Sequence, residues 1–511
     1  MTSSTSTQNK FIEHFLNVKN SKTIQTINNI LSSPWGLAIL GVLTIFSYIF
    51  SLEIVLYSFV AFFVLYVCFF CDDFLPLISL FVFCYVSPSR NNNPGQTSES
   101  VFTSSGVGII IIVSICLLAI LLRIGLDKNM GYKKMFTQKR SLLWGMLALG
   151  LAYFLSGIGS VNYSELVWKN LFFAFLQFIS IFLLYFIFTT TINWEKVRKD
   201  YFAWLGVIMG IVVAFELMHI YLSVNLIEEG VILRKYIYTG WGMRNNIGEM
   251  LALSIPFAFY LACKKKHTYI YLILATLLFC STVLSCSRSS MLFGGIVYLI
   301  SFIITFIKAE NKKWFRISCG ILIGVVAIFV AIFFNKLIKI FEDIPAIITS
   351  NNNQISFIDN SRLEIYENGF KAFLKYPIFG QTFYPTDYIP YDFSTIDSFS
   401  SFFPPRWHNT YIQLLSSCGI VGMLAYIFHR YQTIKLFVKK PTLEKTFIAL
   451  SLVIFLSTSL LDCHFFNIGP TMFYSLALLF AENSPQTNAD QNIKIENENQ
   501  TKAIEEKTET N

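Results

Sequence analysis

Charged residues are scarce in this chain of 511 residues, since Asp, Glu, Lys and Arg together make up only 14% of it. An ordinary soluble domain is excluded, because such domains carry about 25% charged residues. Hydrophobic residues make up 54% of the chain and aromatic residues 17%. Apolar stretches of about twenty residues recur, each long enough to cross a hydrocarbon core of roughly 30 Å as a helix. The short alternating strands of a membrane barrel are not seen. The composition predicts a helical integral membrane protein.

Other features are also missing. The ten cysteines lie mostly inside apolar stretches, which predicts packing residues and neither a disulfide framework nor a metal site. The first thirty residues are polar and contain no short apolar core followed by a small-residue cleavage site, so no cleaved signal peptide is expected. A metal-dependent glycosyl transferase normally supplies a carboxylate cluster such as Asp-x-Asp. The one Asp-Asp pair, Asp72-Asp73, falls on the expected inner side. We therefore expect no metal and no cofactor.

The apolar pattern predicts an all-α, polytopic bundle of about 12–14 transmembrane helices. The expected spans lie near 33–50, 52–70, 74–87, 106–123, 142–158, 168–190, 201–222, 247–263, 268–286, 290–308, 315–334, 410–429, 446–462 and 465–481. The expected organisation is a cytoplasmic segment 1–32, transmembrane helices 33–334, a large extracytoplasmic loop 335–409, transmembrane helices 410–481 and a tail 482–511. Because the tail is polar and almost free of aromatic residues, we expect it to be disordered and cytoplasmic.

The cations predict an orientation. With a cytoplasmic N-terminus, every expected inner loop after residue 120 is basic, as the positive-inside rule requires. These loops hold Arg123, Lys128, Lys133, Lys134, Lys139 and Arg140; Lys196, Arg198 and Lys199; Lys264, Lys265 and Lys266; Lys308, Lys312, Lys313 and Arg316; and Arg430, Lys435, Lys439, Lys440 and Lys445. The formal charge of +8 is therefore mostly inner-face lysine. This distribution argues against a nucleic-acid partner and predicts a multi-pass protein of the cell membrane with both termini cytoplasmic.

The large outer loop has two recognisable parts. Ser361-Arg362-Leu363-Glu364 has the form of a capping box, apolar residues follow at helical spacing, and Pro377 ends the run. This pattern predicts a short amphipathic helix with Arg362 in its first turn. After Gly380, aromatic and acidic residues alternate from Phe383 to Phe393. That stretch is typical both of a sugar-binding surface and of an interfacial aromatic belt, and the pattern leaves the two open.

Four polar clusters stand where inward-running helices are expected to begin on the outer side. They are Arg244-Asn245-Asn246, Ser287-Arg288-Ser289, Ser361-Arg362 and Trp407-His408-Asn409. Each arginine taken alone could simply anchor a helix end among lipid headgroups. Together, cations and helix N-termini on the side where positive charge is scarce suit a diphosphate. We expect the active face to be extracytoplasmic.

His408 stands at the mouth of a span after Pro404-Pro405-Arg406-Trp407. Histidine is the side chain best matched to accepting a proton from a hydroxyl near neutral pH, although a histidine facing lipid headgroups would show the same local pattern. Other ionisable residues lie in the outer halves of spans, namely Glu216 with His219, Glu249, and Asp462 with His464. Glu249 could support the site from behind or contact the acceptor.

These motifs resemble a known family. Trp407-His408-Asn409 followed by Gly419-Ile420-Val421-Gly422 is similar to the His-Asn and Gly-(Ile/Leu)-x-Gly signature of the O-antigen ligase and Wzy-type polysaccharide polymerase superfamily. Three further pieces are similar to that family in the same order. They are Gly242–Asn246, Leu284–Ser289, and Ser361-Arg362 with Pro377–Gly380. The resemblance covers roughly residues 200–480.

The resemblance implies a membrane glycosyltransferase that moves a glycan from a polyprenyl-diphosphate donor, with inversion and without a metal. It implies that Arg288 and Arg362 bind the diphosphate and that His408 is the general base or positions the acceptor. Candidate substrate-binding residues are Arg244, Asn245, Asn409, Arg406 and Glu249. The expected partners are the donor, a glycan acceptor and membrane lipids, and a chain-length regulator is a candidate.

The leading functional hypothesis is polymerisation of lipid-linked repeat units of a capsule, exopolysaccharide or O-antigen. The first alternative is a ligase that transfers the glycan to a lipid core or a protein, and no residue separates the two. The second is a flippase or exporter for the same lipid-linked oligosaccharide. Transporters commonly contain internal repeats around a midplane site. Here no repeat is visible, and the distinctive polar residues gather at the expected outer face.

Overall fold

The computed structural model describes residues 17–50, 52–84, 101–126, 141–161, 163–223, 227–228, 231–232, 237–239, 242–322, 324, 360–384, 406–439 and 441–483. The expected disordered tail lies outside these residues from 484 onward, and so do large parts of the expected outer loop.

The predicted all-α class is confirmed. The first half of the described chain contains α2 (Lys22–Leu31), α3 (Pro34–Phe50), α4 (Glu53–Phe70), η1 (Leu75–Ser79), α5 (Leu80–Cys84), α6 (Val101–Leu126), α8 (Leu143–Phe154), α9 (Tyr163–Phe178), η2 (Ile179–Leu183), α10 (Leu184–Thr191) and α11 (Tyr201–Ser223). The second half contains α12 (Arg244–Lys264), α13 (Thr268–Leu284), α14 (Arg288–Lys308), α16 (Asn360–Lys375), α17 (Thr410–Lys439), α18 (Leu443–Thr458), η6 (His464–Phe466) and α19 (Ile468–Asn483). Residues 312–322 are also helical. Each expected span thus overlaps a helix among its described residues, although residues 155–158, 285–286 and 459–462, at the ends of three expected spans, lie in turns or bends.

Two short hairpins precede α12 and were not predicted. They pair β1 (Ile227–Glu228) with β2 (Val231–Ile232), and β3 (Tyr238–Thr239) with β4 (Gly242–Met243), both antiparallel. A strand of two residues carries too little periodicity to be recognised in a sequence.

Several helices are long and apolar enough to cross a membrane. Among the described residues there are five, namely Val167–Thr191, Tyr201–Ser223, Arg244–Lys264, Arg288–Lys308 and Thr410–Lys439. The pair α2 and α3, bent by 72°, counts as a sixth if it is one span, and four shorter helices are also apolar. The protein is therefore a polytopic helical membrane protein, while the count of 12–14 spans stays a prediction.

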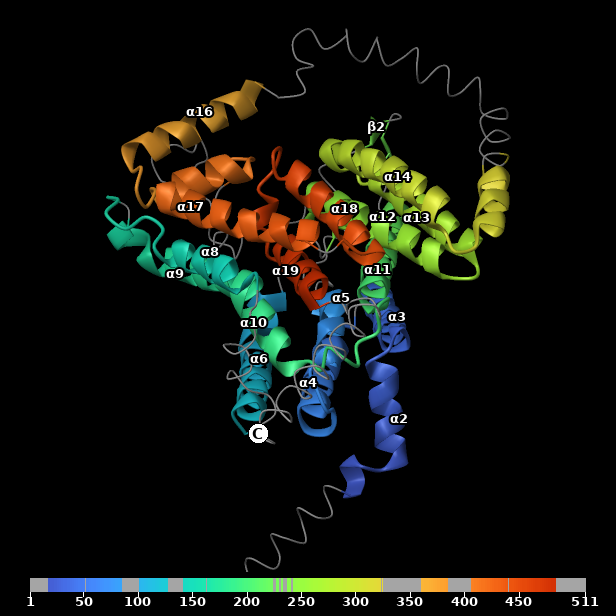
Figure 1. Cartoon of the computed structure of the whole chain (residues 1–511). Helices are drawn as coiled ribbons and strands as arrows, with labels where there is room; N and C mark the ends of the chain where they lie inside the picture. The colour runs from blue at the N-terminus through green and yellow to red at the C-terminus, as the bar shows by residue number, and fades with distance from the viewer. Residues whose placement is uncertain are drawn as a thin grey trace, which may run out of the picture.

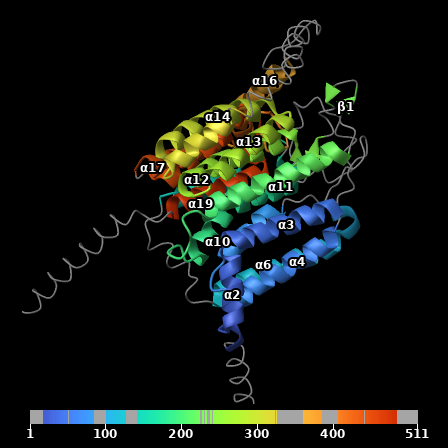
Figure 2. The ribbon, with the colours of Figure 1, turned by 90° about the vertical axis from the view of Figure 1, so that its right-hand side faces the viewer.

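Two central helices organise the bundle. In α12, 94% of the most apolar window is buried, and this helix packs against α11, α13, α14 and α18. α19 lies in the middle of the molecule and contacts α10, α17 and α18 (Figure 1). Figure 2 shows α3 beside α11, with α2 turned away from the bundle. The start of α12 and the turn between α18 and α19 therefore lie next to each other inside the protein.

The N-terminal part of α17 is separated from the rest by a break. Gly419 has φ 64° and ψ −157°, which no helical residue adopts. The segment after α16 fills this break, since Ile420 N–H donates to the Pro377 carbonyl at 2.8 Å and Gln381 N–H donates to the Ser416 carbonyl at 2.7 Å. The Pro377–Gly380 and Gly419–Gly422 motifs thus meet in space, and the inserted segment satisfies backbone groups that the break sets free.

Two sequence interpretations need correction here. Arg430 was placed in a basic inner loop, but α17 continues through it to Lys439 because the helix resumes after Gly419. Phe383 and Tyr384 were placed in an exposed aromatic stretch, yet their exposed fractions are 0% and 6%. The Phe383 ring packs against Tyr153, Phe173 and Phe466. These two aromatic residues anchor the outer segment in the core, and the rest of that stretch, from residue 385, lies outside the described residues.

The C-terminal end of the last helix also differs slightly from expectation. The tail was expected to begin at residue 482, but α19 continues to Asn483. The Glu482 carboxylate accepts hydrogen bonds from Ser141 N–H at 2.6 Å and Leu142 N–H at 3.2 Å, and from the Tyr185 hydroxyl. Glu482 therefore satisfies free N–H groups where α8 begins.

Candidate active site

The polar clusters predicted from the sequence do stand at helix starts. Arg244 is the first residue of α12, Arg288 the first of α14, and His408-Asn409 directly precede α17. Arg362 lies in the first turn of α16. These helix N-termini carry free N–H groups and partial positive charge, which favour an anion.

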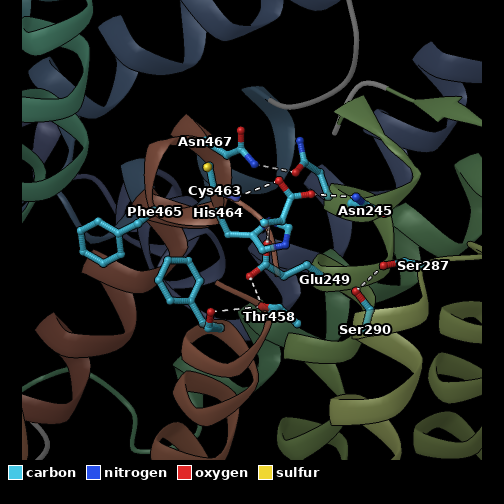
Figure 3. A network of polar contacts seen from close by, with 12 residues as sticks. Asn245, Glu249, Ser287, Ser290, Thr458, Cys463, His464, Phe465 and Asn467 are labelled. Carbon is cyan, nitrogen blue, oxygen red and sulfur yellow. Dashed lines mark hydrogen bonds and ion pairs between the residues drawn. The ribbon is translucent and has the colours of Figure 1, made fainter. Parts of the chain in front are cut away.

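The start of α12 is bonded to the turn between α18 and α19. The Asn245 amide donates to Asp462 Oδ2 at 2.7 Å, and the Asn467 amide donates to Asn246 Oδ1 at 2.7 Å (Figure 3). Asp462 also accepts the Cys463 N–H through Oδ1 at 2.7 Å. The carboxylate is thereby held in one orientation by groups on both elements.

His408 contacts the same carboxylate. Its Nδ1 lies 3.4 Å from Asp462 Oδ1, an ion-pair contact without the alignment of a hydrogen bond. The His408 side chain is 38% exposed, whereas that of Asp462 is 8% exposed. The imidazole is therefore partly exposed with a buried carboxylate behind it, the arrangement that orients a catalytic histidine.

The backbone at His408 has an unusual conformation and is held by contacts from α16. His408 has φ 51°, in the left-handed region that few residues other than glycine adopt. The Tyr366 hydroxyl of α16 donates to the His408 carbonyl at 3.0 Å. A Cβ on Gly369 of α16 would lie 3.0 Å from the Trp407 ring, so α16 rests closely on this segment. Such local strain persists where the surroundings hold it, and it is common at functional sites.

Asn409 is the N-terminal cap of α17. Its Oδ1 accepts the N–H groups of Tyr411 at 2.9 Å and Ile412 at 3.1 Å, and its Nδ2 donates to the Leu460 carbonyl at 2.9 Å. Both ends of this amide have protein partners. Asn409 therefore fixes the direction of α17 beside His408, and its direct contact with substrate stays a prediction.

Glu249 and His464 form a second carboxylate–imidazole pair beneath the first. Both side chains are 0% exposed, and Glu249 Oε2 contacts His464 Nδ1. The Thr458 hydroxyl donates to Glu249 Oε1 at 3.1 Å (Figure 3). In this structure Glu249 faces the interior of the bundle, which agrees with support from behind rather than contact with an acceptor.

Asp462 is buried beside several groups that carry or can gain a positive charge. Burial raises the pKa of this carboxyl, but His408, His464 and Arg406 together lower the pKa well below its usual range. Arg406, half-buried just before His408, is thus close enough to act on the same carboxylate. The site thus places the Asp462 carboxylate beside one arginine and two histidines that can become positively charged.

Arg288 is exposed at the start of α14. Within the described part of the chain its side chain has no hydrogen bond or ion pair, so its guanidinium is available to a ligand. A Cβ on Gly248 would lie 2.5 Å from Ser285 Oγ and 2.7 Å from Ser287 Cβ, so the turn before α14 is pressed against the first turns of α12. Arg288 and Asn245 therefore lie at the same end of the bundle.

The two remaining predicted arginines are Arg244 and Arg362. Arg244 is half-buried at the first residue of α12. The Arg362 side chain lies outside the described side chains, so its approach to Arg288 stays a prediction. Among the described residues, no group of three or more His, Cys, Asp or Glu side chains is arranged to hold a metal ion.

Asp462 is a functional candidate that the sequence motifs do not identify as a site residue. The sequence marked it only as an ionisable residue beside His464. Its partners Asn245 and His408 lie far away along the chain, the former by 217 residues. No local pattern could join them.

Comparison with known proteins gives one family match. Residues 273–427 match the family model Wzy_C, described as O-antigen ligase. The match includes Arg288, Arg362 and His408, whereas Asn245 and Asp462 fall outside it. No curated protein matches the chain. The chain is thus a polytopic membrane protein whose residues 273–427 match the O-antigen ligase model, which supports the superfamily resemblance of its motifs and an enzyme of the glycosyl-transfer type.

Proposed function

We propose that this protein transfers a glycan from a polyprenyl-diphosphate donor to a hydroxyl of a second glycan at the outer face of the cell membrane. In its most specific form, the proposal is polymerisation of lipid-linked repeat units. The observation that carries it is the partly exposed His408 beside the buried carboxylate of Asp462, at a bundle end where Arg288 has no hydrogen bond or ion pair among the described residues.

The reaction is a displacement at the anomeric carbon. The acceptor oxygen forms the new glycosidic bond while the bond to the diphosphate oxygen breaks, and that oxygen keeps the electron pair. His408 accepts the acceptor's proton through Nε2, since Nδ1 faces Asp462. Attack from the side opposite the leaving group inverts the anomeric configuration.

The leaving diphosphate gains negative charge in the transition state. Arg288, Arg362 and the N-termini of α14 and α16 would stabilise that charge, because preorganised cations and N–H groups act more strongly where charge develops. Guanidinium groups suit phosphate oxygens through their bidentate geometry. The transfer then needs no divalent ion.

The test is incubation of the purified protein with undecaprenyl-diphosphate oligosaccharide extracted from the source cells, followed by mass analysis. A polymerase should yield a ladder of products that differ by one repeat unit. A product that forms only after a second lipid or protein acceptor is added would instead assign a ligase. Sugar that crosses a vesicle membrane without bond formation would refute glycan transfer.

The role of His408 has its own test. His408→Ala should lower kcat by about 10²–10⁴-fold while donor affinity stays close to that of the wild type. His267→Ala is a matched control, because His267 is an exposed histidine at the start of α13. Normal turnover in His408→Ala would remove this histidine from the mechanism.

A further inference from the structure

A half-buried cation lies elsewhere in the same bundle, and the proposed chemistry does not use it. Arg430 is roughly halfway between Gly419 and the end of α17 at Lys439. Its Nη1 donates to the Tyr474 hydroxyl at 2.8 Å, while Nε and Nη2 are buried without a hydrogen-bond acceptor among the described residues. A charged group whose nitrogens are enclosed in this way within a membrane protein is costly and generally marks function.

Aromatic rings surround the guanidinium where a carboxylate would be expected. Its central carbon lies 4.5 Å from the centre of the Tyr426 ring, 5.0 Å from that of Tyr474 and 5.2 Å from that of Phe465. No carboxylate pairs with Arg430 within the described part of the chain. Cation–π attraction grows when the cation is desolvated, so three ring faces together can hold this charge.

The three rings come from three different elements. Tyr426 lies on α17, Phe465 on η6 and Tyr474 on α19. The His429 ring reinforces the same contact, with Nε2 2.7 Å from the Tyr474 hydroxyl. Arg430 therefore joins α17, which begins beside His408, to the turn that carries Asp462.

The rings also pack against one another along this connection. The Phe465 ring centre lies 5.6 Å from that of Tyr426 and 5.2 Å from that of Tyr474. Further out, the Tyr426 ring meets the Tyr411 ring at 5.7 Å. Tyr411 lies three residues after His408, and Phe465 lies three residues after Asp462. The aromatic cluster therefore reaches both residues of the site.

We propose that Arg430 is a positioning residue that clamps the α18–α19 turn against α17 and thereby sets the contact between Asp462 and His408. The proposal rests on the proposed function, because it assigns this contact a role in turnover. Arg430 itself contacts neither substrate nor the reacting atoms. Its effect on catalysis passes through the Phe465 ring and the turn.

The experiment is a double-mutant cycle on the full-length protein, with undecaprenyl-diphosphate oligosaccharide from the source cells as donor. Arg430→Met keeps the approximate length of the side chain and removes the charge. It should lower kcat by about ten- to a hundredfold, since small displacements far from the chemistry have effects of that size. The KM for the donor should change little. Arg430→Met combined with Asp462→Asn should then lose little more kcat than Asp462→Asn alone, because the two act through one contact.

A merely structural role would give a different result. The two kcat losses would then multiply, and that outcome overturns the proposal. Wild-type kcat in Arg430→Met also overturns it while leaving the proposed function intact. An inactive wild-type protein, in contrast, would remove both. If Arg430→Met does not fold, Arg430→Lys serves in the same cycle, since lysine keeps the charge but lacks the planar group that faces three rings.

Lys435→Met provides the matched control. Lys435 lies on the same helix and its ammonium group is 5.9 Å from the Tyr431 ring centre, but both residues are exposed. This variant also removes a cation beside an aromatic ring. It should retain the kcat of the wild type.

Discussion

Asp462 Oδ1 lies 3.4 Å from Nδ1 of His408, across the junction between the α18–α19 turn and the start of α17. The other carboxylate oxygen of Asp462 accepts the amide of Asn245 at 2.7 Å. Three elements, α12, α17 and the turn, thus meet at one buried negative charge. The proposed chemistry depends on this junction, and its parts can be tested separately.

Asp462→Asn keeps the shape of the side chain and removes its charge. We expect kcat to fall by about ten- to a hundredfold, because an amide orients the imidazole less well and does not stabilise its protonated form. Initial rates with the lipid-linked donor measure this effect. Asp200→Asn is the control, since Asp200 forms ion pairs with Arg198 and Lys265 away from the site. An equal loss in the two variants would contradict the assignment.

Arg288→Gln should weaken stabilisation of the leaving diphosphate. We expect kcat/KM for the donor to fall by about 10²–10³-fold, the usual effect of removing one donor to a developing anion. Arg288→Lys should recover only part of the loss, because lysine cannot bind phosphate oxygens in a bidentate manner. Arg316→Gln, at an exposed arginine on another helix, should leave kcat/KM unchanged. Full activity of Arg288→Gln would exclude this residue from the site.

Glu249→Gln should lower the free energy of unfolding of the protein. Both Glu249 and His464 are fully buried, and loss of one partner from a buried pair costs about 3–5 kcal/mol. The double variant Glu249→Leu/His464→Leu should unfold closer to the wild type, because it leaves no unpaired buried group. Thermal unfolding in detergent measures both. A double variant less stable than Glu249→Gln would contradict this account.

Gly419→Ala should disrupt the junction of α16 and α17. A Cβ there would lie 2.3 Å from the Ile378 carbonyl oxygen, and φ 64° disfavours any residue with a side chain. We expect a loss of at least about 1–3 kcal/mol in the free energy of unfolding. Gly320→Ala is the matched control, since a Cβ at that helical glycine meets nothing within 4 Å. An unchanged unfolding temperature for Gly419→Ala would show that the break closes without cost.

Chelation with EDTA should leave turnover unchanged. The proposed charge stabilisation comes from arginines and helix N-termini, which do not depend on a divalent ion. The measurement is the rate of product formation before and after chelation. A lost rate that Mg²⁺ or Mn²⁺ restores would refute metal independence.

Much of the fold could be predicted because the signal for a membrane helix lies within one continuous stretch of the sequence. A run of apolar residues long enough to cross the bilayer is an energetic requirement of that segment alone. The predicted spans therefore overlap helices, and Arg288 and His408 were found at helix starts. Ser361-Arg362 likewise marked the beginning of α16, and Pro377 its end.

Local sequence pattern was thus enough to predict the membrane class, the helices, and the arginine and histidine at helix starts. Packing between helices was needed to show that Asp462 lies behind His408, that the segment after Pro377 fills the break at Gly419, and that aromatic rings surround the Arg430 guanidinium. The physical reason is that hydrophobicity acts along the chain, residue by residue. The partner of a buried charge is selected by packing between helices, which brings together residues hundreds of positions apart.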